Sequence, residues 1–257
     1  MSDSTVQANR AVWELASAKH VREYDDLLAQ ARSGPALTAV ELELLGPLLR
    51  QRPAVVHLQS GQGLDDIALT HAGASGVIGV DYSVVAATSA ARRASELGLP
   101  CAYVVAQLPP APLRDGCADL VYTGKGALIW IPDLQSWADD VFRLLEPGGR
   151  LFVHEAHPMV PLYRWDADAA RLRPDRSYFD RQHVNDTFPA RGAVEWQWTL
   201  GDLVTAVVRA GLRIEELREH PEPFWRPGDV EAAVWDGRLP NTFSLLARRP
   251  LALADQP

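Results

Sequence analysis

The sequence predicts an α/β protein whose seven-stranded, mostly parallel sheet carries helices on both faces. Short apolar runs alternate with helical patterns along residues 54–156, as in successive βαβ units. Turns that contain glycine or proline separate many of these segments. The 257 residues, 47% hydrophobic and 23% charged, have the composition of an ordinary globular chain. We therefore expect a sheet domain over residues 53–257, preceded by a helical segment over residues 1–52.

Composition and charge argue against several classes of protein. No apolar run reaches the roughly 18 residues that a membrane span needs, and the N-terminus lacks the pattern of a secretory signal. Two cysteines, Cys101 and Cys117, are too few for a disulfide scaffold or a four-ligand zinc site. The net charge of −8 and the scattered basic residues disfavour a nucleic-acid partner. We expect a cytoplasmic protein with reduced thiols.

Two helical patterns precede the sheet. Apolar residues recur at helical spacing over Ala8–Ala31, and the Ser-Gly-Pro sequence at residues 33–35 ends this pattern. Thr38 is placed to cap a second helix that runs to Leu49, with Glu41 completing a capping box.

Strands and helices then alternate. Residues 54–59 form a short apolar run that is typical of a buried parallel strand, and Gly98 is placed to end the helix before the third strand. The predicted strands are 54–59, 76–81, 101–106, 118–123, 150–156, 212–218 and 241–247. The helices predicted between them are 64–71, 83–97, 134–145 and 199–210.

Residues 158–198 break this rhythm and predict an irregular insert. Five of the eight tryptophans follow residue 158. Large rings outside the sheet suggest a cap over a flat or apolar substrate, although the same rings could attach long loops to the body. Tyr178 and His183 lie in this insert and are candidates to face the substrate. A second loop, rich in Pro and Trp, spans residues 220–240.

A glycine-containing loop follows the first predicted strand and precedes a helix. Gly61 and Gly63 let the backbone approach a ligand, because no Cβ stands in the way. Asp65 and Asp66 would repel a pyrophosphate, but they suit a ligand with a cationic group and no phosphate, such as S-adenosylmethionine (SAM). The two carboxylates also complement the helix dipole, and the two interpretations do not exclude each other.

Asp81 ends the second predicted strand. A carboxylate at this strand end can accept hydrogen bonds from both ribose hydroxyls of a nucleoside. The alternative role is to cap the next helix, for which Ser83 is better placed. We therefore expect Asp81 to bind ribose.

The stretch Val55–His157 resembles the core of class I SAM-dependent methyltransferases. The family motif D/E-x-G-x-G-x-G corresponds to residues 57–63 (HLQSGQG), with His57 in place of the acid and Gln59 in place of the first glycine. Further family motifs correspond to residues 79–83 (GVDYS), 117–122 (CADLVY) and 145–149 (LEPGG). Gln107 stands where the family usually has an acidic residue near the adenine amine.

The resemblance implies SAM as the cofactor and an antiparallel last strand. It also implies an N-terminal helical lid over SAM, for which Tyr24 is a candidate; packing in the core is the alternative role of that ring. The expected cofactor-binding residues are Tyr24, Gln59, Ser60, Gly61, Gly63, Asp81, Tyr82, Gln107, Leu108, Thr123 and Gly124.

Methyl transfer requires the nucleophile, the methyl group and the sulfur to be aligned, and a weakly acidic nucleophile also needs a base. His157 ends the fifth predicted strand, and the ordinary pKa of histidine suits a catalytic base. Hydrogen bonding to the backbone is the alternative role of His157. Lys125 is interpreted as a solvated loop lysine. The spacing of His154 and His157 is not that of a zinc motif, so no metal site is predicted.

Together these observations predict methyl transfer from SAM to an oxygen or nitrogen of a small molecule, such as a specialised metabolite. One alternative is an enzyme that uses SAM without methylating, as a cyclase on the same fold would. Another is a non-catalytic SAM-binding protein. The base-amine motif [DN]-P-P-[YF] is missing after the fourth strand, which adds to the case against nucleic acid. We expect no membrane partner, and the sequence leaves open whether the chain is a monomer or a homodimer.

Overall fold

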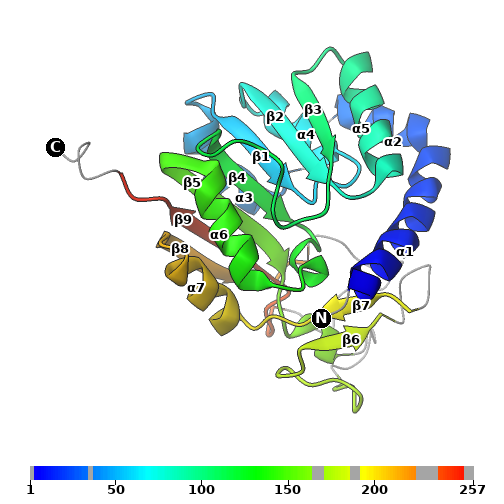
Figure 1. Ribbon diagram of the computed structural model, residues 1–257, viewed down its shortest axis with the longest axis vertical. Helices are drawn as coiled ribbons and strands as arrows, with labels where there is room; N and C mark the ends of the chain where they lie inside the picture. Colours follow the sequence, from blue (N-terminus) through cyan, green and yellow to red (C-terminus); the bar gives the residue numbers. More distant parts are fainter. Residues whose placement is uncertain (1–2, 34–36, 164–170, 186–191, 224–236, 252–257) are drawn as a thin grey trace.

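In the computed structural model, residues 3–33, 37–163, 171–185, 192–223 and 237–251 are described. They form a seven-stranded sheet of order β3-β2-β1-β4-β5-β9-β8 and a separate two-stranded sheet (Figure 1). Within the seven-stranded sheet, β9 is antiparallel to β5 and β8, and the other pairs are parallel. The predicted sheet is therefore confirmed. Its strands are β1 (Ala54–Leu58), β2 (Gly76–Asp81), β3 (Cys101–Val105), β4 (Ala118–Gly124), β5 (Leu145–Ala156), β8 (Arg213–His220) and β9 (Thr242–Arg248).

The helices differ from the prediction mainly at the N-terminus. The single helix predicted over Ala8–Ala31 is two helices, because a turn at Glu23 separates α1 from α2. Thr38 caps α3 through the predicted capping box with Glu41. No described helix has both the length and the apolarity that crossing a bilayer requires. The helices are α1 (Asp3–Arg22), α2 (Tyr24–Ser33), α3 (Ala39–Leu49), α4 (Leu64–His71), α5 (Val84–Glu96), α6 (Leu134–Leu144) and α7 (Leu200–Arg209), with short 3-10 turns η1 (Leu128–Trp130) and η2 (Val160–Leu162).

Side chains of the sheet alternate between two apolar cores. In β1, Val55 packs in a cluster with Leu45 and Leu49 of α3, whereas Val56 packs in a cluster with Trp137 of α6. Helices α6 and α7 thus cover one face and α3 and α4 the other (Figure 1). Each large apolar side chain buried in this way contributes about 1.5–3 kcal/mol. The two cores hold the carboxyl ends of the parallel strands in fixed positions.

Strand β5 begins earlier than predicted. Residues 145–149, which lie before the predicted strand 150–156, already belong to the strand, and the β4–β5 pairing shifts register between Ala118 and Leu120. Gly149 passes close to the backbone of β4, where an added Cβ would lie 3.0 Å from the carbonyl oxygen of Ala118. At Gly149, the motif of residues 145–149 therefore makes a close strand contact that only glycine permits without a shift.

The cap insert is more regular than predicted. It contains a hairpin of two three-residue strands, β6 (Gln182–Val184) and β7 (Val194–Trp196). Strands this short give almost no alternation signal. The hairpin lies against the N-terminal end of α1 (Figure 1), where Asn9 exchanges two hydrogen bonds with the backbone of Val194, at 2.7 and 2.9 Å. Most of the predicted loop over residues 220–240 lies outside the described residues.

Candidate functional site

Two adjoining cavities lie at the carboxyl ends of the parallel strands. The smaller cavity has a volume of about 220 Å³ and the larger cavity about 500 Å³. The same four residues line both of them: Trp13, Lys125, Gly126 and Trp130. The rings of Trp13 and Trp130 stack with their centroids 5.7 Å apart. A ligand in the smaller cavity can therefore reach one in the larger cavity past these shared residues.

The glycine loop forms one wall of the smaller cavity. Gly61 and Gly63 both have left-handed backbone conformations, with φ of 52° and 72°. A Cβ at Gly63 would lie 2.5 Å from the hydroxyl oxygen of Tyr103 and 2.7 Å from Cβ of Ala90, so no side chain fits there. A Cβ at Gly61 would meet nothing within 4 Å. The loop therefore leaves open space that a ligand can enter.

Gln59 replaces the first glycine of the family motif but keeps the glycine-like backbone. Its φ is 55°, a left-handed value that costs a non-glycine residue about 1–2 kcal/mol. The side-chain oxygen Oε1 lies 3.1 Å from Oγ1 of Thr123. The amide nitrogen Nε2 is buried and has no hydrogen-bond partner within the described parts of the chain. A ligand in the smaller cavity, which Gln59 lines, can satisfy that donor.

Asp81 lies beside the glycine loop, as predicted. One carboxylate oxygen accepts the backbone N–H of Gly61 at 2.9 Å and the other accepts that of Ser83 at 2.8 Å. Burial raises the pKa of Asp81 despite these hydrogen bonds. Each oxygen retains a second lone pair for a ligand hydroxyl. The neighbouring ring of Tyr82 also lines the cavity, and burial raises the pKa of its hydroxyl.

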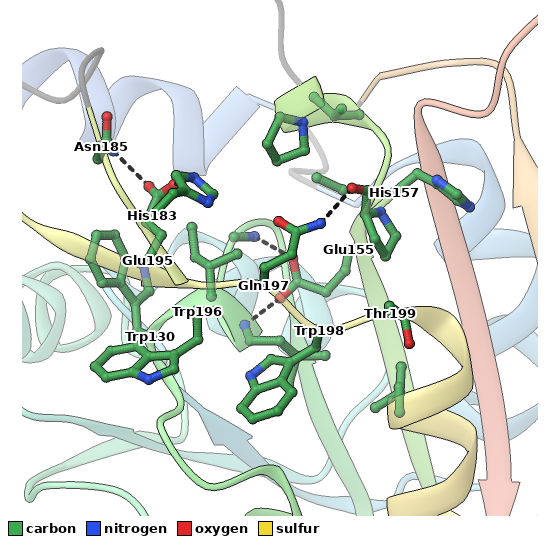
Figure 2. A pocket seen from close by; sticks show the side chains of 18 of the residues that line it. Trp130, Glu155, His157, His183, Asn185, Glu195, Trp196, Gln197, Trp198 and Thr199 are labelled. Carbon is green, nitrogen blue, oxygen red and sulfur yellow. Dashed lines mark hydrogen bonds and ion pairs between the residues drawn. The ribbon is translucent and has the colours of Figure 1, made fainter. Parts of the chain in front are cut away.

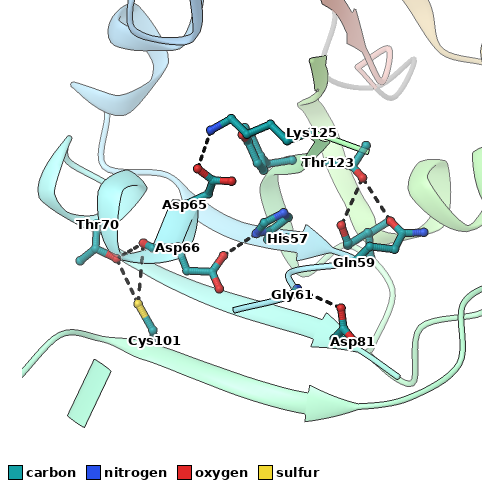
Figure 3. A network of polar contacts seen from close by, with 12 residues as sticks. His57, Gln59, Gly61, Asp65, Asp66, Thr70, Asp81, Cys101, Thr123 and Lys125 are labelled. Atoms are coloured by element: carbon teal, nitrogen blue, oxygen red, sulfur yellow. Dashed lines mark hydrogen bonds and ion pairs between the residues drawn. The ribbon is translucent and has the colours of Figure 1, made fainter. Parts of the chain in front are cut away.

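A buried charge network forms the opposite wall (Figure 3). Nδ1 of His57 lies 2.5 Å from Oδ1 of Asp66, and Nζ of Lys125 lies 2.5 Å from Oδ1 of Asp65 and 3.2 Å from Oε2 of Glu41. Burial alone would lower the pKa of His57, but the adjacent Asp66 carboxylate outweighs this effect and the pKa is raised. Burial likewise opposes ionisation of Lys125, yet Asp65 and Glu41 raise the pKa of its ammonium.

Glu41 anchors this network from helix α3. Its carboxylate is fully buried and accepts hydrogen bonds from Tyr122 and from the backbone of Thr38. Burial would raise the pKa of Glu41, but its hydrogen bonds and the Lys125 charge lower it to about 2. The interpretation of Lys125 as a solvated loop lysine is wrong, because its side chain is only 19% exposed and pairs with two acids.

Seven of the predicted cofactor residues line the smaller cavity and four do not. Tyr24 packs against α5, where its hydroxyl donates to Glu96 at 3.1 Å, so Trp13 is the α1–α2 residue that reaches the cavity. Leu108 is buried in the apolar core and Gln107 is exposed. Thr123 is buried behind Gln59 and positions it. The lining residues are Gln59, Ser60, Gly61, Gly63, Asp81, Tyr82 and Gly124.

Glu155 holds the segment that separates the two cavities (Figure 2). Its buried carboxylate accepts the backbone N–H groups of Gly126, Ala127 and Leu128 at 2.7–2.8 Å. Burial raises the pKa of Glu155 in spite of these three hydrogen bonds. Glu155 is not among the predicted site residues; it acts by fixing the backbone beside Lys125.

His157 lines the larger cavity, but both of its ring nitrogens already have partners. Nε2 lies 2.9 Å from a carboxylate oxygen of Glu219, and Nδ1 accepts the backbone N–H of Met159 at 3.1 Å. Burial lowers the pKa of His157 against the opposing effect of Glu219. These contacts match the alternative role, a strand-end histidine bonded to the backbone, and they disfavour the predicted catalytic base.

Several aromatic rings line the rest of the larger cavity. Trp196 and Trp198 follow one another along the cap hairpin and its exit (Figure 2), and the indole N–H of Trp198 donates to the carbonyl of Ile131 at 2.9 Å. His183 lies on the same hairpin and lines the cavity, as predicted. Tyr178 is not among the lining residues; its ring contacts Phe179. The other late tryptophans, Trp165, Trp225 and Trp235, lie outside the described residues.

Comparisons with known proteins agree with this geometry. Residues 55–149 match the family model described as a methyltransferase domain, and no curated protein matches the chain. A SAM-dependent methyltransferase from Mesorhizobium loti is 26% identical, with a TM-score of 0.59, and the alignment covers 79% of this chain and 96% of that one. A geranyl diphosphate C-methyltransferase from Streptomyces coelicolor A3(2), solved with S-adenosyl-L-homocysteine, is 17% identical (TM-score 0.57; 80% and 79% covered).

A third solved structure shares the fold over almost the whole length. The [4+2]-cyclase SpnF is 16% identical, with a TM-score of 0.60, and the alignment covers 96% of this chain and 97% of that one. The family match, the strand order and the glycine loop at the end of β1 are mutually consistent. Residues 55–149 thus match a methyltransferase domain, and the chain has a fold similar to that of SAM-dependent methyltransferases.

Proposed function

We propose that the protein transfers a methyl group from SAM to an oxygen or nitrogen of a small molecule. The observation that carries this proposal is the pair of cavities. The smaller cavity combines a glycine loop with the Asp81 carboxylate, and it adjoins the larger cavity through the shared residues. A donor and an acceptor bound in the two cavities meet beside Trp13 and Trp130, which is the alignment that methyl transfer requires.

The residues of the smaller cavity fit the parts of SAM. Asp81 accepts the ribose hydroxyls, and Nε2 of Gln59 is a free donor within the described residues. Lys125 and Asp65 form a pair of opposite charges that complements the carboxylate and ammonium of the amino-acid end. The stacked rings of Trp13 and Trp130 offer π faces to the sulfonium. SAM supplies the methyl group; these residues bind it and fix its orientation.

The larger cavity supports a small acceptor. Its volume of about 500 Å³ is typical of small-molecule sites. The cap hairpin and α1 form part of its wall, through Glu195, Trp196 and Trp13. The net charge of −8 also argues against a nucleic-acid acceptor.

Calorimetry tests the cofactor and product analysis tests the reaction. We expect heat with SAM and with S-adenosylhomocysteine (SAH), and none with NAD, because the Asp65 carboxylate, which lines the smaller cavity, disfavours a pyrophosphate. Incubation with SAM and a panel of aromatic alcohols and amines should yield SAH and a methylated product. Absence of heat with both SAM and SAH would overturn the proposal.

A cyclase-type use of SAM is the second candidate, supported by the coverage of the SpnF structure. Such an enzyme would bind SAM but form no SAH during turnover. An isomerised product without SAH formation would therefore favour this candidate over methyl transfer.

A further inference from the structure

We propose that His183, oriented by Glu195, is the general base of the larger cavity and that the acceptor is an aromatic hydroxyl compound. This inference deepens the proposed methyltransferase function and rests on it. The two residues lie opposite each other in the β6–β7 hairpin, a directly paired position of its antiparallel register. Both also line the larger cavity (Figure 2). The cap therefore carries a titratable pair on its inner surface.

Hydrogen bonds hold the pair of His183 and Glu195 in place. Nε2 of His183 lies 2.9 Å from Oε2 of Glu195, and Nδ2 of Asn185 donates to Oε1 of the same carboxylate at 2.6 Å. The side chains of His183 and Glu195 are only 10% and 14% exposed. Asn9 of α1 fixes the adjacent backbone of β7 through its two hydrogen bonds with Val194. The carboxylate thus has one oxygen for each partner and little freedom to move.

The hydrogen bond to Glu195 sets the tautomer of His183. A carboxylate accepts hydrogen bonds, so Nε2 carries the proton and Nδ1 keeps its lone pair. Within the described parts of the chain, Nδ1 of His183 has no hydrogen-bond partner. His157 differs in this respect, because its Nδ1 already accepts the N–H of Met159. Of the two cavity histidines, His183 is therefore the one that can take a proton from a ligand.

The lining of the cavity indicates which hydroxyl would lose its proton. Rings of Trp196, Trp198 and Tyr163 line the cavity and suit a flat aromatic compound. A phenol has a pKa of about 10, within about four units of imidazole, whereas an aliphatic hydroxyl is much less acidic. A neutral amine attacks without prior loss of a proton and so needs no base of this kind. A histidine–glutamate pair in an aromatic cavity therefore favours a phenol.

The proposed step balances. Nδ1 of His183 takes the phenol proton while the phenol oxygen forms a bond to the methyl carbon. The carbon–sulfur bond breaks, and its electron pair stays on sulfur. The products are an aryl methyl ether, SAH and an imidazolium that Glu195 stabilises until the proton passes to solvent. The positive charge lost from the sulfonium thus appears on His183.

A coloured phenol, 4-nitrophenol, provides a test that does not depend on the natural acceptor. Quenching of tryptophan fluorescence measures its binding, and phenolate absorbance measures its ionisation. In the SAH-loaded protein we expect the bound dye to ionise at lower pH than the free dye. His183→Asn should abolish this shift and Glu195→Gln should reduce it. His71→Gln, which replaces an exposed histidine of α4, is the matched control and should leave the shift unchanged.

Other charges in the cavity could also favour a phenolate, and the variants separate their effect. The charged and titratable groups that line the cavity with His183 are Lys125, Glu155, His157, Tyr163, Arg173, Arg176 and Glu195. If Lys125, Arg173 and Arg176 alone lowered the pH at which the bound dye ionises, His183→Asn would keep the shift, and the inference would be wrong. Dye that does not quench the fluorescence, or that titrates as free dye when bound, would equally overturn it.

SAH calorimetry on each variant separates this inference from the proposed function. Retained SAH affinity shows that the variant is folded and that its cofactor cavity is intact. With SAM in place of SAH and unsubstituted phenol, whose pKa is about 10, in place of the dye, methylation should fall by about 100-fold or more in His183→Asn, the effect of losing a general base. That loss should appear in kcat rather than in KM. If the unmodified protein did not bind SAH, the methyltransferase proposal itself would be overturned.

Discussion

Replacing Lys125 by methionine tests how the smaller cavity binds the amino-acid end of the cofactor. Nζ of Lys125 lies 2.5 Å from Asp65 and 3.2 Å from Glu41, and the side chain is 19% exposed. Methionine keeps most of the side-chain length and removes the charge. The substitution also leaves two acids without their cation. We therefore compare the affinities of the variant for two ligands, because the ratio of these affinities is more informative than either affinity alone.

The two ligands are SAH and 5′-methylthioadenosine, which share the nucleoside but differ in the amino-acid end. A hydrogen bond to a charged group contributes about 1.5–3 kcal/mol, which corresponds to a factor of about 10 to 150 in affinity. We expect Lys125→Met to lose that factor for SAH. Its affinity for 5′-methylthioadenosine should stay within about twofold of the original, since that ligand does not reach Lys125.

Isothermal calorimetry with both ligands measures the preference. Lys19→Met is the matched control, because Lys19 is the other lysine of the sequence and its side chain is 61% exposed on α1. Thermal unfolding of each variant shows whether the fold is retained. An unchanged ratio of the two affinities in Lys125→Met would refute the assignment of the amino-acid end to this wall.

Three further predictions follow from the same site. Glu41→Gln should lower the free energy of unfolding at pH 7 by about 3 kcal/mol, which is the stabilisation that corresponds to a pKa lowered from 4.5 to about 2. In the unmodified protein this stabilisation is present above pH 4.5 and is lost as the pH falls towards 2. Urea unfolding at several pH values should therefore show a shallower acid dependence in the variant. Asp81→Asn should weaken SAH and 5′-methylthioadenosine equally, by about tenfold or more, and calorimetry that showed no change would remove the ribose assignment. Gln59→Gly should be more stable than Gln59→Ala by about 1 kcal/mol, opposite to the usual order, because only glycine adopts φ of 55° without strain; equal denaturation midpoints would contradict this.

The backbone of the site could be predicted because its signals are local. A strand, two glycines and a helix follow one another between residues 54 and 71, and Asp81 ends the next strand. The carboxyl ends of parallel strands meet at one edge of the sheet, so their end residues can be placed from sequence alone. The structure confirms the seven-stranded, mostly parallel sheet and brings Gly61, Gly63 and Asp81 to one cavity.

The charge network could not be predicted because its partners are far apart in the chain. Lys125 pairs with Glu41 of α3 and Asp65 of α4, and no local pattern links the three positions. Trp13 was missed for the same reason, since its stacking partner is Trp130. For His57 the sequence does offer an indication. Where a histidine replaces the family's acidic residue, a nearby acidic residue such as Asp66 can supply the missing negative charge.

Helix α1 contributes a residue to both cavities and contacts the cap hairpin and the start of α5. Asn9 holds the cap hairpin, Trp13 lines both cavities, and Glu14 accepts the backbone N–H groups of Val84 and Val85 at the start of α5. A single helix thus lines both the donor cavity and the acceptor cavity. Because the same helix contacts the cap hairpin, both cavities and the start of α5, a change in its position would alter the donor and acceptor cavities together.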